Sequence, residues 1–171
     1  GQTDGRGNTT RWEYNPDGTL KKAVFADTGV MEYTWDLLGR KLTQKDQRGN
    51  VTAFAYNAFS KIRQEKDPYN NTVQYKYDLN GNVVSIMDKR GSVSIIKYDA
   101  LNRPAEKRTP IELDGSGNFL YSIEKLAYDE AGNLKKRTLT GTKDKFDLRE
   151  TAYTYYANNL TDTTTDSAGR T

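Results

Sequence analysis

The chain has 171 residues, 26 basic and 23 acidic side chains for a formal net charge of +3, and neither cysteine nor histidine. The lack of both residues excludes disulfides, thiol nucleophiles and thiolate metal sites, and it removes the side chain used most often as a general base near neutral pH. Hydrophobic residues make up only 35% and many are aromatic, which favours a single layer of sheet over a thick core.

An aromatic residue recurs at a fixed interval along the chain. Five such residues are each 21 positions apart, and the last two follow after 30 and 27 positions. Self-similarity at a fixed period is typical of repeat architectures. We therefore expect residues 1–171 to form a single array of about seven repeats, truncated at both ends. The recurring aromatics are Tyr14, Trp35, Tyr56, Tyr77, Tyr98, Tyr128 and Tyr155.

Each repeat contains two turn signals with one spacing, Asp-x-x-Gly. A type I turn favours Asp at its first position, where the carboxylate accepts a hydrogen bond from a nearby main-chain N–H, and Gly at its fourth, where φ is often positive. Such a turn followed by a left-handed residue is a common closure of a β-hairpin. The predicted turn residues are Asp36, Gly39, Asp46, Gly49, Asp67, Asn70, Asp78, Gly81, Asp88, Gly91, Asp129 and Gly132.

The residues between the turns alternate as in a β-strand. In the segment 72–77, Val73, Tyr75 and Tyr77 share one face and polar residues share the other. A return strand follows each Tyr-Asp turn, with one apolar anchor six residues after the aromatic in most copies and Lys41 as the exception. The predicted fold class is all-β, built of antiparallel hairpin repeats. Roughly 14 strands exceed the size at which open sheets tend to curl, about 10, so we expect a curved, spiralling sheet.

Four segments depart from the regular repeat. The sequence Asp27-Thr28-Gly29 is one residue short of the second turn signal, which predicts an irregular loop. Irregular insertions are expected near 109–127 and 138–152, and such excess usually lies in longer hairpin loops. The final residues, 166–171, end where a further strand is expected to begin.

These motifs resemble the Rhs, or YD-repeat, family, whose name comes from the Tyr-Asp pair found here at Tyr77-Asp78, Tyr98-Asp99 and Tyr128-Asp129. The resemblance extends over essentially the whole chain. It implies that the hairpins spiral into a hollow shell, which in bacterial members encloses a toxic C-terminal domain and in animal teneurins serves cell adhesion. Family shells also contain a self-cleavage site around Asp-Pro-Gly, and Asp67-Pro68 does not match it because Tyr69 follows.

The sequence also suggests several specific binding or catalytic roles that are less well supported than the repeat itself. Asp114 begins a segment with oxygen ligands at alternate positions, as in a calcium loop, but Lys125 stands where a bidentate Glu is required. A glycosidase would need two acids across a cleft, whereas the conspicuous acids have turn roles. The aromatic stripe could stack on sugars, although cross-strand packing explains it better. The basic cluster 135–137 is short and interspersed acids favour a solvated face over a nucleic-acid site.

Two functional classes remain open. The first is a wall segment of a shell that encloses a C-terminal toxin, which the resemblance places in a secreted or cell-surface and bacterial protein, with adjoining repeats and the toxin domain as partners. The second is a cell-surface adhesion module that binds glycans or proteins. We expect no enzymatic activity, no cofactor, no metal and no nucleic-acid partner. No apolar run approaches the roughly 20 residues of a membrane span, and the first residues lack the apolar stretch of a signal peptide.

Overall fold

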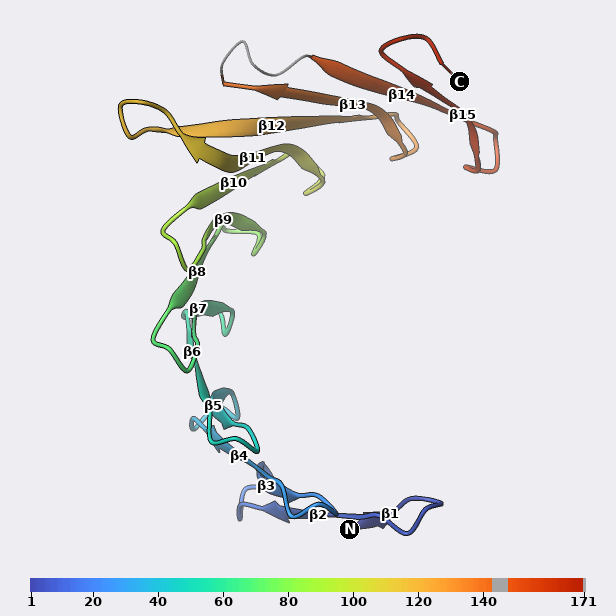
Figure 1. Ribbon diagram of the computed structural model, residues 1–171. Coiled ribbons are helices and arrows are strands. Elements are labelled where there is room, and N and C mark those ends of the chain that lie inside the picture. Colours follow the sequence, from blue (N-terminus) through green and yellow to red (C-terminus); the bar gives the residue numbers. More distant parts are fainter. Residues whose placement is uncertain (143–147, 171) are drawn as a thin grey trace. The chain divides into compact units, whose positions relative to one another are not determined.

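The computed structural model describes residues 1–142 and 148–170, and the described chain consists of strands and tight turns. The strands follow one another in chain order in one open sheet, and each described pair is antiparallel (Figure 1). The predicted all-β class of antiparallel hairpins is therefore confirmed. The strands are β1 (Gln2–Thr3), β2 (Thr9–Tyr14), β3 (Leu20–Val24), β4 (Val30–Trp35), β5 (Lys41–Lys45), β6 (Val51–Tyr56), β7 (Ile62–Lys66), β8 (Thr72–Tyr77), β9 (Val83–Met87), β10 (Val93–Tyr98), β11 (Pro104–Leu113), β12 (Phe119–Tyr128), β13 (Leu134–Gly141), β14 (Arg149–Tyr155) and β15 (Thr161–Asp166).

The chain divides into two compact units, Gly1–Tyr75 and Lys76–Thr171. The first unit contains β1 to β7 and the beginning of β8, in hairpins of nearly constant length. The second unit contains the end of β8 and β9 to β15, and its hairpins include longer strands. Each unit is a single layer of sheet, so its strands are stabilised mainly by their neighbours in the chain.

All described turns have one geometry. In the turn 46–50, Asp46 N–H donates to the Asn50 carbonyl and Gly49 N–H donates to the Asp46 carbonyl, both at 2.9 Å. The fourth residue of the turn is left-handed, with φ of 84° at Gly49. We call the turns after the repeat aromatics the first turns and the others the second turns, and we number their residues as positions 1 to 5. The first turns begin at residues 15, 36, 57, 78, 99, 129 and 156, and the second turns at 4, 25, 46, 67, 88, 114 and 166.

The loop around Asp27 is a regular second turn, so the prediction of an irregular loop is wrong. Phe25 N–H donates to the Gly29 carbonyl at 2.9 Å, and Thr28 N–H donates to the Phe25 carbonyl at 3.0 Å. Phe25 occupies position 1 and Thr28 occupies the left-handed position with φ of 66°. Pairing of the two strands sets this geometry even though neither residue is the usual choice, while Asp27 accepts from Gly29 N–H.

The extra residues near 109–127 lengthen the strands and leave the turn unchanged. β11 and β12 have ten residues each, whereas a standard return strand such as β9 has five and the following strand, β10, has six. The connecting turn 114–118 is an ordinary second turn. The expectation of a longer loop here is therefore wrong, because the added residues pair with each other. The expected insertion near 138–152 includes residues 143–147, which lie outside the described residues.

The sheet has almost no buried core. Among the described residues, only Ala23 and Leu120 are buried apolar side chains, with 4% and 6% exposure. The large side chains on the strands are mostly half-buried against neighbouring strands, whereas those on the turns are mostly exposed. The described part of the chain has no helix that is long and apolar enough to cross a membrane. A single layer, as the composition predicts, accounts for this distribution.

Candidate functional site

The described hairpins closed by first turns contain a β-bulge next to the aromatic residue. In the hairpin of β6 and β7, Ala55 lies opposite Gln64 but Tyr56 lies opposite Ile62, so Arg63 has no partner in the ladder. A bulge leaves one residue unpaired and bends its strand. The beginning of the return strand is therefore the irregular part of these hairpins. The same shift in register occurs before Tyr14, Trp35, Tyr98, Tyr128 and Tyr155.

The hydroxyl group of the repeat tyrosine binds to this irregular part of the preceding repeat. Tyr56 Oη donates a hydrogen bond to the carbonyl of Lys41 at 2.8 Å, and Tyr98 Oη donates to the carbonyl of Val83 at 3.0 Å. The acceptor is in both cases the first residue of a return strand, and Lys41 lies beside the bulge of its hairpin. The tyrosine of the Tyr-Asp motif is thus a contact between repeats, with its ring on the sheet and its hydroxyl on a main-chain carbonyl. The longer repeats have the same bond, from Tyr128 to Pro104 and from Tyr155 to Leu134, both at 2.8 Å.

Two residues that depart from the consensus maintain the contact by other chemistry. Trp35 replaces tyrosine, and its indole Nε1–H donates to the carbonyl of Leu20 at 2.7 Å. Lys41 replaces the apolar anchor, and its ammonium lies 5.7 Å from the ring centroid of Tyr33 and 5.3 Å from that of Phe54. An aromatic face attracts a cation. A lysine is therefore accommodated at this position, next to the rings of Tyr33 and Phe54.

Arg40 joins its own first turn to the next one. Its Nε lies 2.7 Å from Oδ2 of Asp36, its guanidinium carbon lies 4.8 Å from the ring centroid of Tyr56, and Nη1 donates to Oγ of Ser60 at 3.2 Å. Hydrogen bonds from the main-chain N–H and the guanidinium of Arg40 hold the pKa of Asp36 below its ordinary value, although partial burial opposes them. The carboxylate therefore stays charged and fixes the arginine over the neighbouring ring.

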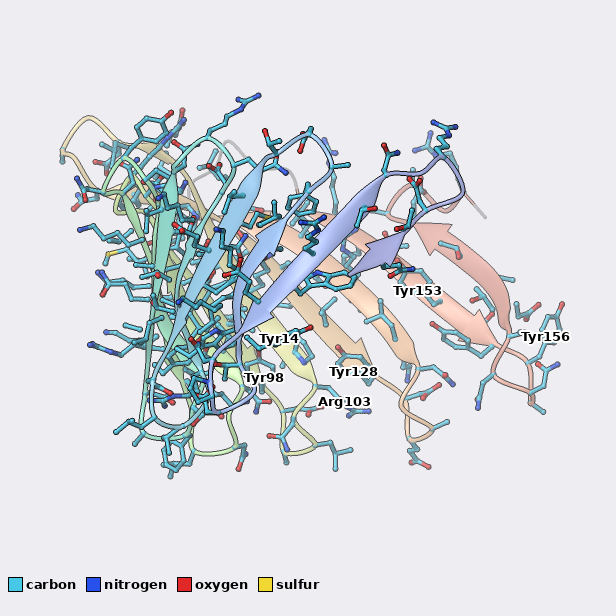
Figure 2. All side chains as sticks on the ribbon, turned by 90° about the horizontal axis from the view of Figure 1, so that it is seen from below. Tyr14, Tyr98, Arg103, Tyr128, Tyr153 and Tyr156 are labelled. Carbon is cyan, nitrogen blue, oxygen red and sulfur yellow. The ribbon has the colours of Figure 1, made fainter. Side chains whose placement is uncertain are left out.

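Arg103 repeats the ion pair and the ring contact of Arg40 in the second unit. Its Nε lies 2.7 Å from Oδ2 of Asp99, and its guanidinium carbon lies 4.4 Å from the ring centroid of Tyr128. Figure 2 shows Arg103 beside Tyr128 near the first-turn end of the hairpins. Burial raises the pKa of the Tyr128 hydroxyl. The phenol therefore remains protonated at neutral pH and can donate its hydrogen bond.

Asparagine can take the place of arginine at turn position 5. Asn82 Nδ2 lies 3.0 Å from Oδ2 of Asp78 in its own turn and 2.8 Å from Oδ1 of Asn102 in the next first turn. Asn133 Nδ2 likewise lies 3.0 Å from Oδ1 of Asn159. Position 5 of one first turn thus contacts position 4 of the next, across about 20 residues of sequence.

The carboxylates of the second turns serve their own turns. Asp46 Oδ1 accepts from the N–H groups of Arg48 and Asn50 at 2.9 Å, and Asn50 Nδ2 donates to Oδ2. The side chain and main chain of Asn50 lower the pKa of Asp46. Asp114, the candidate calcium ligand, accepts from two N–H groups of its turn in the same way. Among residues 1–142 and 148–170, no group of three acidic side chains is placed to hold a metal ion.

The structure places the predicted residues at two kinds of position. The repeat aromatics lie at the ends of the strands that precede the first turns, where Tyr14 is 59% exposed. The predicted Asp residues occupy position 1, and Asn70 and the predicted glycines occupy the left-handed position 4, with φ of 84° at Gly81. The structure does not gather these residues into one cleft; they recur along the array. Sequence reasoning missed the arginines and asparagines at position 5, although the pair of Asp with Arg or Asn four residues later recurs at Asp36, Asp78, Asp99 and Asp129.

The fold is similar to that of much longer toxin chains. A crystal structure of TcdB2-TccC3-Cdc42 has 18% sequence identity and a TM-score of 0.74 over 93% of this chain and 9% of that chain. A crystal structure of TcdB2-TccC3 without its hypervariable C-terminal region has 19% identity and a TM-score of 0.74 over 94% of this chain and 9% of the other. A Tc holotoxin pore from Photorhabdus luminescens has 18% identity and a TM-score of 0.72 over 94% and 9%.

This chain thus spans about a tenth of the length of the toxin chains that it matches. No protein-family model and no curated protein sequence matches it. At this identity the likeness concerns the fold, and it agrees with the repeat motif of Tyr-Asp pairs, double turn signals and 21-residue spacing. The chain therefore has the β-hairpin-repeat fold of these Tc toxin chains, the fold expected for the YD-repeat family that its motif resembles.

Proposed function

We propose that this chain is part of the wall of a β-hairpin shell, and that this shell encloses the C-terminal toxin domain of the parent protein. The observation that carries the proposal is a hydrogen bond from a repeat aromatic to the preceding repeat, as in Tyr56 to Lys41. The described bonds of this kind start from Trp35, Tyr56, Tyr98, Tyr128 and Tyr155. These bonds use the polar groups of the most prominent side chains within the array. A chain whose repeats are bonded to one another in this way is suited to form a continuous wall.

A non-enzymatic role fits the same contacts. The carboxylates of Asp36, Asp46 and Asp99 each accept main-chain hydrogen bonds in their own turns. Their pKa values are lowered, whereas a general acid near neutral pH requires a raised one. These acids therefore act as fixed acceptors that hold the turns.

The toxin payload, the secreted location and a bacterial parent are parts of the proposal that rest on the similar structures. One of those structures is described as lacking a hypervariable C-terminal region, and another is a holotoxin pore. A chain with this fold that belongs to a long secreted protein would contribute a few hairpins to a wall of many. Its direct partners would be adjoining repeats, and its inner surface would face the payload.

An adhesion module is the second candidate, and the exposed apolar residues on the first turns favour protein partners for it. Leu37 and Leu79 are almost fully exposed, and Phe59 and Leu101 are 76% and 70% exposed. Exposed apolar groups in a series often mark contact surfaces. A glycan platform is less well supported, because the ring of Tyr56 lies against Arg40 and its hydroxyl donates to a carbonyl.

The test is protease protection of the region that follows this chain in the intact parent protein. The intact parent should protect its C-terminal domain from a protease that digests the same domain when it is expressed alone. A parent from which residues 37–78 are deleted, two complete hairpins, should leave the domain open to digestion. Equal digestion in the intact and deleted proteins would reject containment, and binding of the intact parent to cell surfaces would then support adhesion.

A further inference from the structure

The turns of the regular 21-residue repeats alternate between two kinds, except at 15–19, so that matching turn sequences recur every 42 residues. Second turns with Arg at position 3 and Gly at position 4 occur at 4–8, 46–50 and 88–92, whereas the turns 25–29 and 67–71 between them have Thr28 and Asn70 at position 4. The first turns between residues 36 and 103 alternate in the same way, whereas the turn 15–19 before them also has a glycine, Gly18, at position 4. Leu at position 2 with Gly at position 4 occurs at Leu37 with Gly39 and at Leu79 with Gly81, while Ala at position 2 with Ser or Asn at position 4 occurs at Ala58 with Ser60 and at Ala100 with Asn102.

The non-glycine residues of the first turns adopt a backbone conformation that disfavours them. Ser60, Asn102 and Asn159 have φ of 59°, 60° and 63°. Left-handed backbone is costly for residues with a Cβ atom, and asparagine tolerates it better than most. A compensating contact is therefore expected at these positions.

Each of these three side chains accepts a hydrogen bond from position 5 of the preceding first turn. Ser60 Oγ accepts from Arg40 at 3.2 Å, and Asn102 Oδ1 accepts from Asn82 and also from Asn80 at 2.8 Å. We propose that these residues are couplers that join the first turns in pairs, and that the structural unit of the array is a pair of hairpins. The third coupler is Asn159, whose Oδ1 accepts from Asn133 at 3.0 Å. The coupled first turns are 36–40 with 57–61, 78–82 with 99–103, and 129–133 with 156–160.

The second turns contain a natural control for this proposal. Asn50 and Asn70 occupy positions 5 and 4 of successive second turns, with the same residue types and the same separation as Asn82 and Asn102. They instead line an open hollow of about 360 Å³, and in the described contacts no hydrogen bond joins them. The hairpins of these second turns also lack a bulge. The link therefore depends on the first-turn geometry and not on residue type alone.

Two double-mutant cycles test the coupling. One combines Asn82→Ala with Asn102→Gly, and the other combines Asn50→Ala with Asn70→Gly. The readout is hydrogen exchange of the strand amides beside each turn, with circular dichroism to verify folding. Asn102→Gly should speed exchange in β10 and β11 although glycine suits the left-handed position, and its effect should shrink when Asn82 is already alanine. Asn70→Gly should leave exchange in β7 and β8 unchanged or slower. Coupling of equal size in the two cycles, or none in the first, would overturn the proposal.

A gain of the link can be tested at the glycines. An added Cβ at Gly132 would lie 3.7 Å from Nη1 of Arg103, an ordinary contact distance, whereas an added Cβ at Gly39 would meet nothing within 4 Å. Both residues are left-handed, with φ of 91° and 73°. Gly132→Asn should therefore lower the melting temperature less than Gly39→Asn, and the difference should disappear when Arg103 is replaced by alanine. Equal shifts for the two variants with Arg103 present would contradict side-chain coupling between turns.

Discussion

The phenol hydroxyl of Tyr98 donates a hydrogen bond to the carbonyl of Val83, fifteen residues earlier in the chain and in the preceding repeat, at 3.0 Å. Val83 begins the return strand that follows the previous first turn. The Tyr98 hydroxyl thus joins two neighbouring hairpins. The 21-residue period places these hairpins next to each other but does not by itself link them. The main consequences can be measured as changes in stability.

Replacing Tyr98 with phenylalanine should lower the free energy of unfolding by about 1 kcal/mol, because the ring stays and the Val83 carbonyl loses its partner. For a domain of this size the melting temperature should fall by about 2–4 °C. Thermal unfolding followed by circular dichroism measures the shift. Tyr14→Phe is the matched control, since Tyr14 is 59% exposed and its hydroxyl has no hydrogen-bond partner among the described residues. Equal shifts in the two variants would contradict a role for the hydroxyl.

Replacing Gly39 with alanine should destabilise the chain by about 1–2 kcal/mol, because Gly39 has φ of 73° and a left-handed alanine is strained. An added Cβ at Gly39 meets no atom within 4 Å, so the effect isolates the backbone conformation. Gly5→Ala is the control: its surroundings are equally open and its φ is not left-handed. Urea denaturation of both variants should show a lower midpoint for Gly39→Ala alone.

Acidification should destabilise the array as the turn carboxylates become protonated. Hydrogen bonds from Asn50 and Asn82 lower the pKa of Asp46 and Asp78 in the folded state. A lowered folded pKa means that the stabilisation is complete above the unfolded value, about 3.9, and is lost as the pH falls through the folded pKa. Urea midpoints should therefore be constant from pH 7 to 5 and should decline below about pH 4.

The variant Asp46→Asn provides the control for this pH effect. Asn57 occupies position 1 of a first turn and accepts the same main-chain bonds at 2.9 and 3.0 Å, so an asparagine can hold such a turn without titrating. Asp46→Asn should fold at neutral pH and should lose less stability than the wild type between pH 5 and 2.5. An identical decline in both proteins would assign the acid sensitivity to other groups.

Calcium should not stabilise the chain. Asp114 Oδ1 accepts from Ser116 and Asn118 N–H at 2.9 Å within its turn, which leaves it committed to backbone donors. Addition of millimolar calcium chloride should change the melting temperature by less than the scatter of repeated scans, with magnesium chloride as the ionic-strength control. A rise of several degrees specific to calcium would indicate binding to the folded state and would revive the metal-site hypothesis.

The repeat could be predicted because the signals that specify it lie within short segments of the sequence. The 21-residue spacing and the alternation in segments such as 72–77 are enough to place strands, and Asp-x-x-Gly is enough to place turns. Where a local signal weakens, the prediction failed although the fold did not change. At 25–29 the turn forms with Phe25 and Thr28 in unfavourable positions, because it connects β3 and β4, which pair with each other.

The contacts between repeats could not be predicted, because they depend on register and on side chains about 15 to 20 residues apart. The bond from Tyr56 to Lys41 ends beside the bulge at the beginning of β5. Nothing in the local sequence marks that bulge. Lys41 itself looked like an exception to the anchor pattern, and only the positions of Tyr33 and Phe54 explain how a cation fits there.

In the long hairpin of β11 and β12, strand pairing constrains how many residues can be added to each strand. Relative to a standard hairpin, β11 is longer by five residues and β12 by four, and the register accommodates the odd residue where Pro110 pairs with Tyr121 and Glu112 pairs with Leu120. Ile111 stands between them as a bulge and is 49% exposed. Without this bulge, the one extra residue in β11 would exchange the two side-chain faces of that strand between the extra residue and the turn. We expect second-turn hairpins to tolerate equal additions to both strands, and additions that differ by one only with such a bulge. An insertion in this array therefore extends a paired arm by roughly 3.4 Å per residue in each strand and carries the unchanged turn outward.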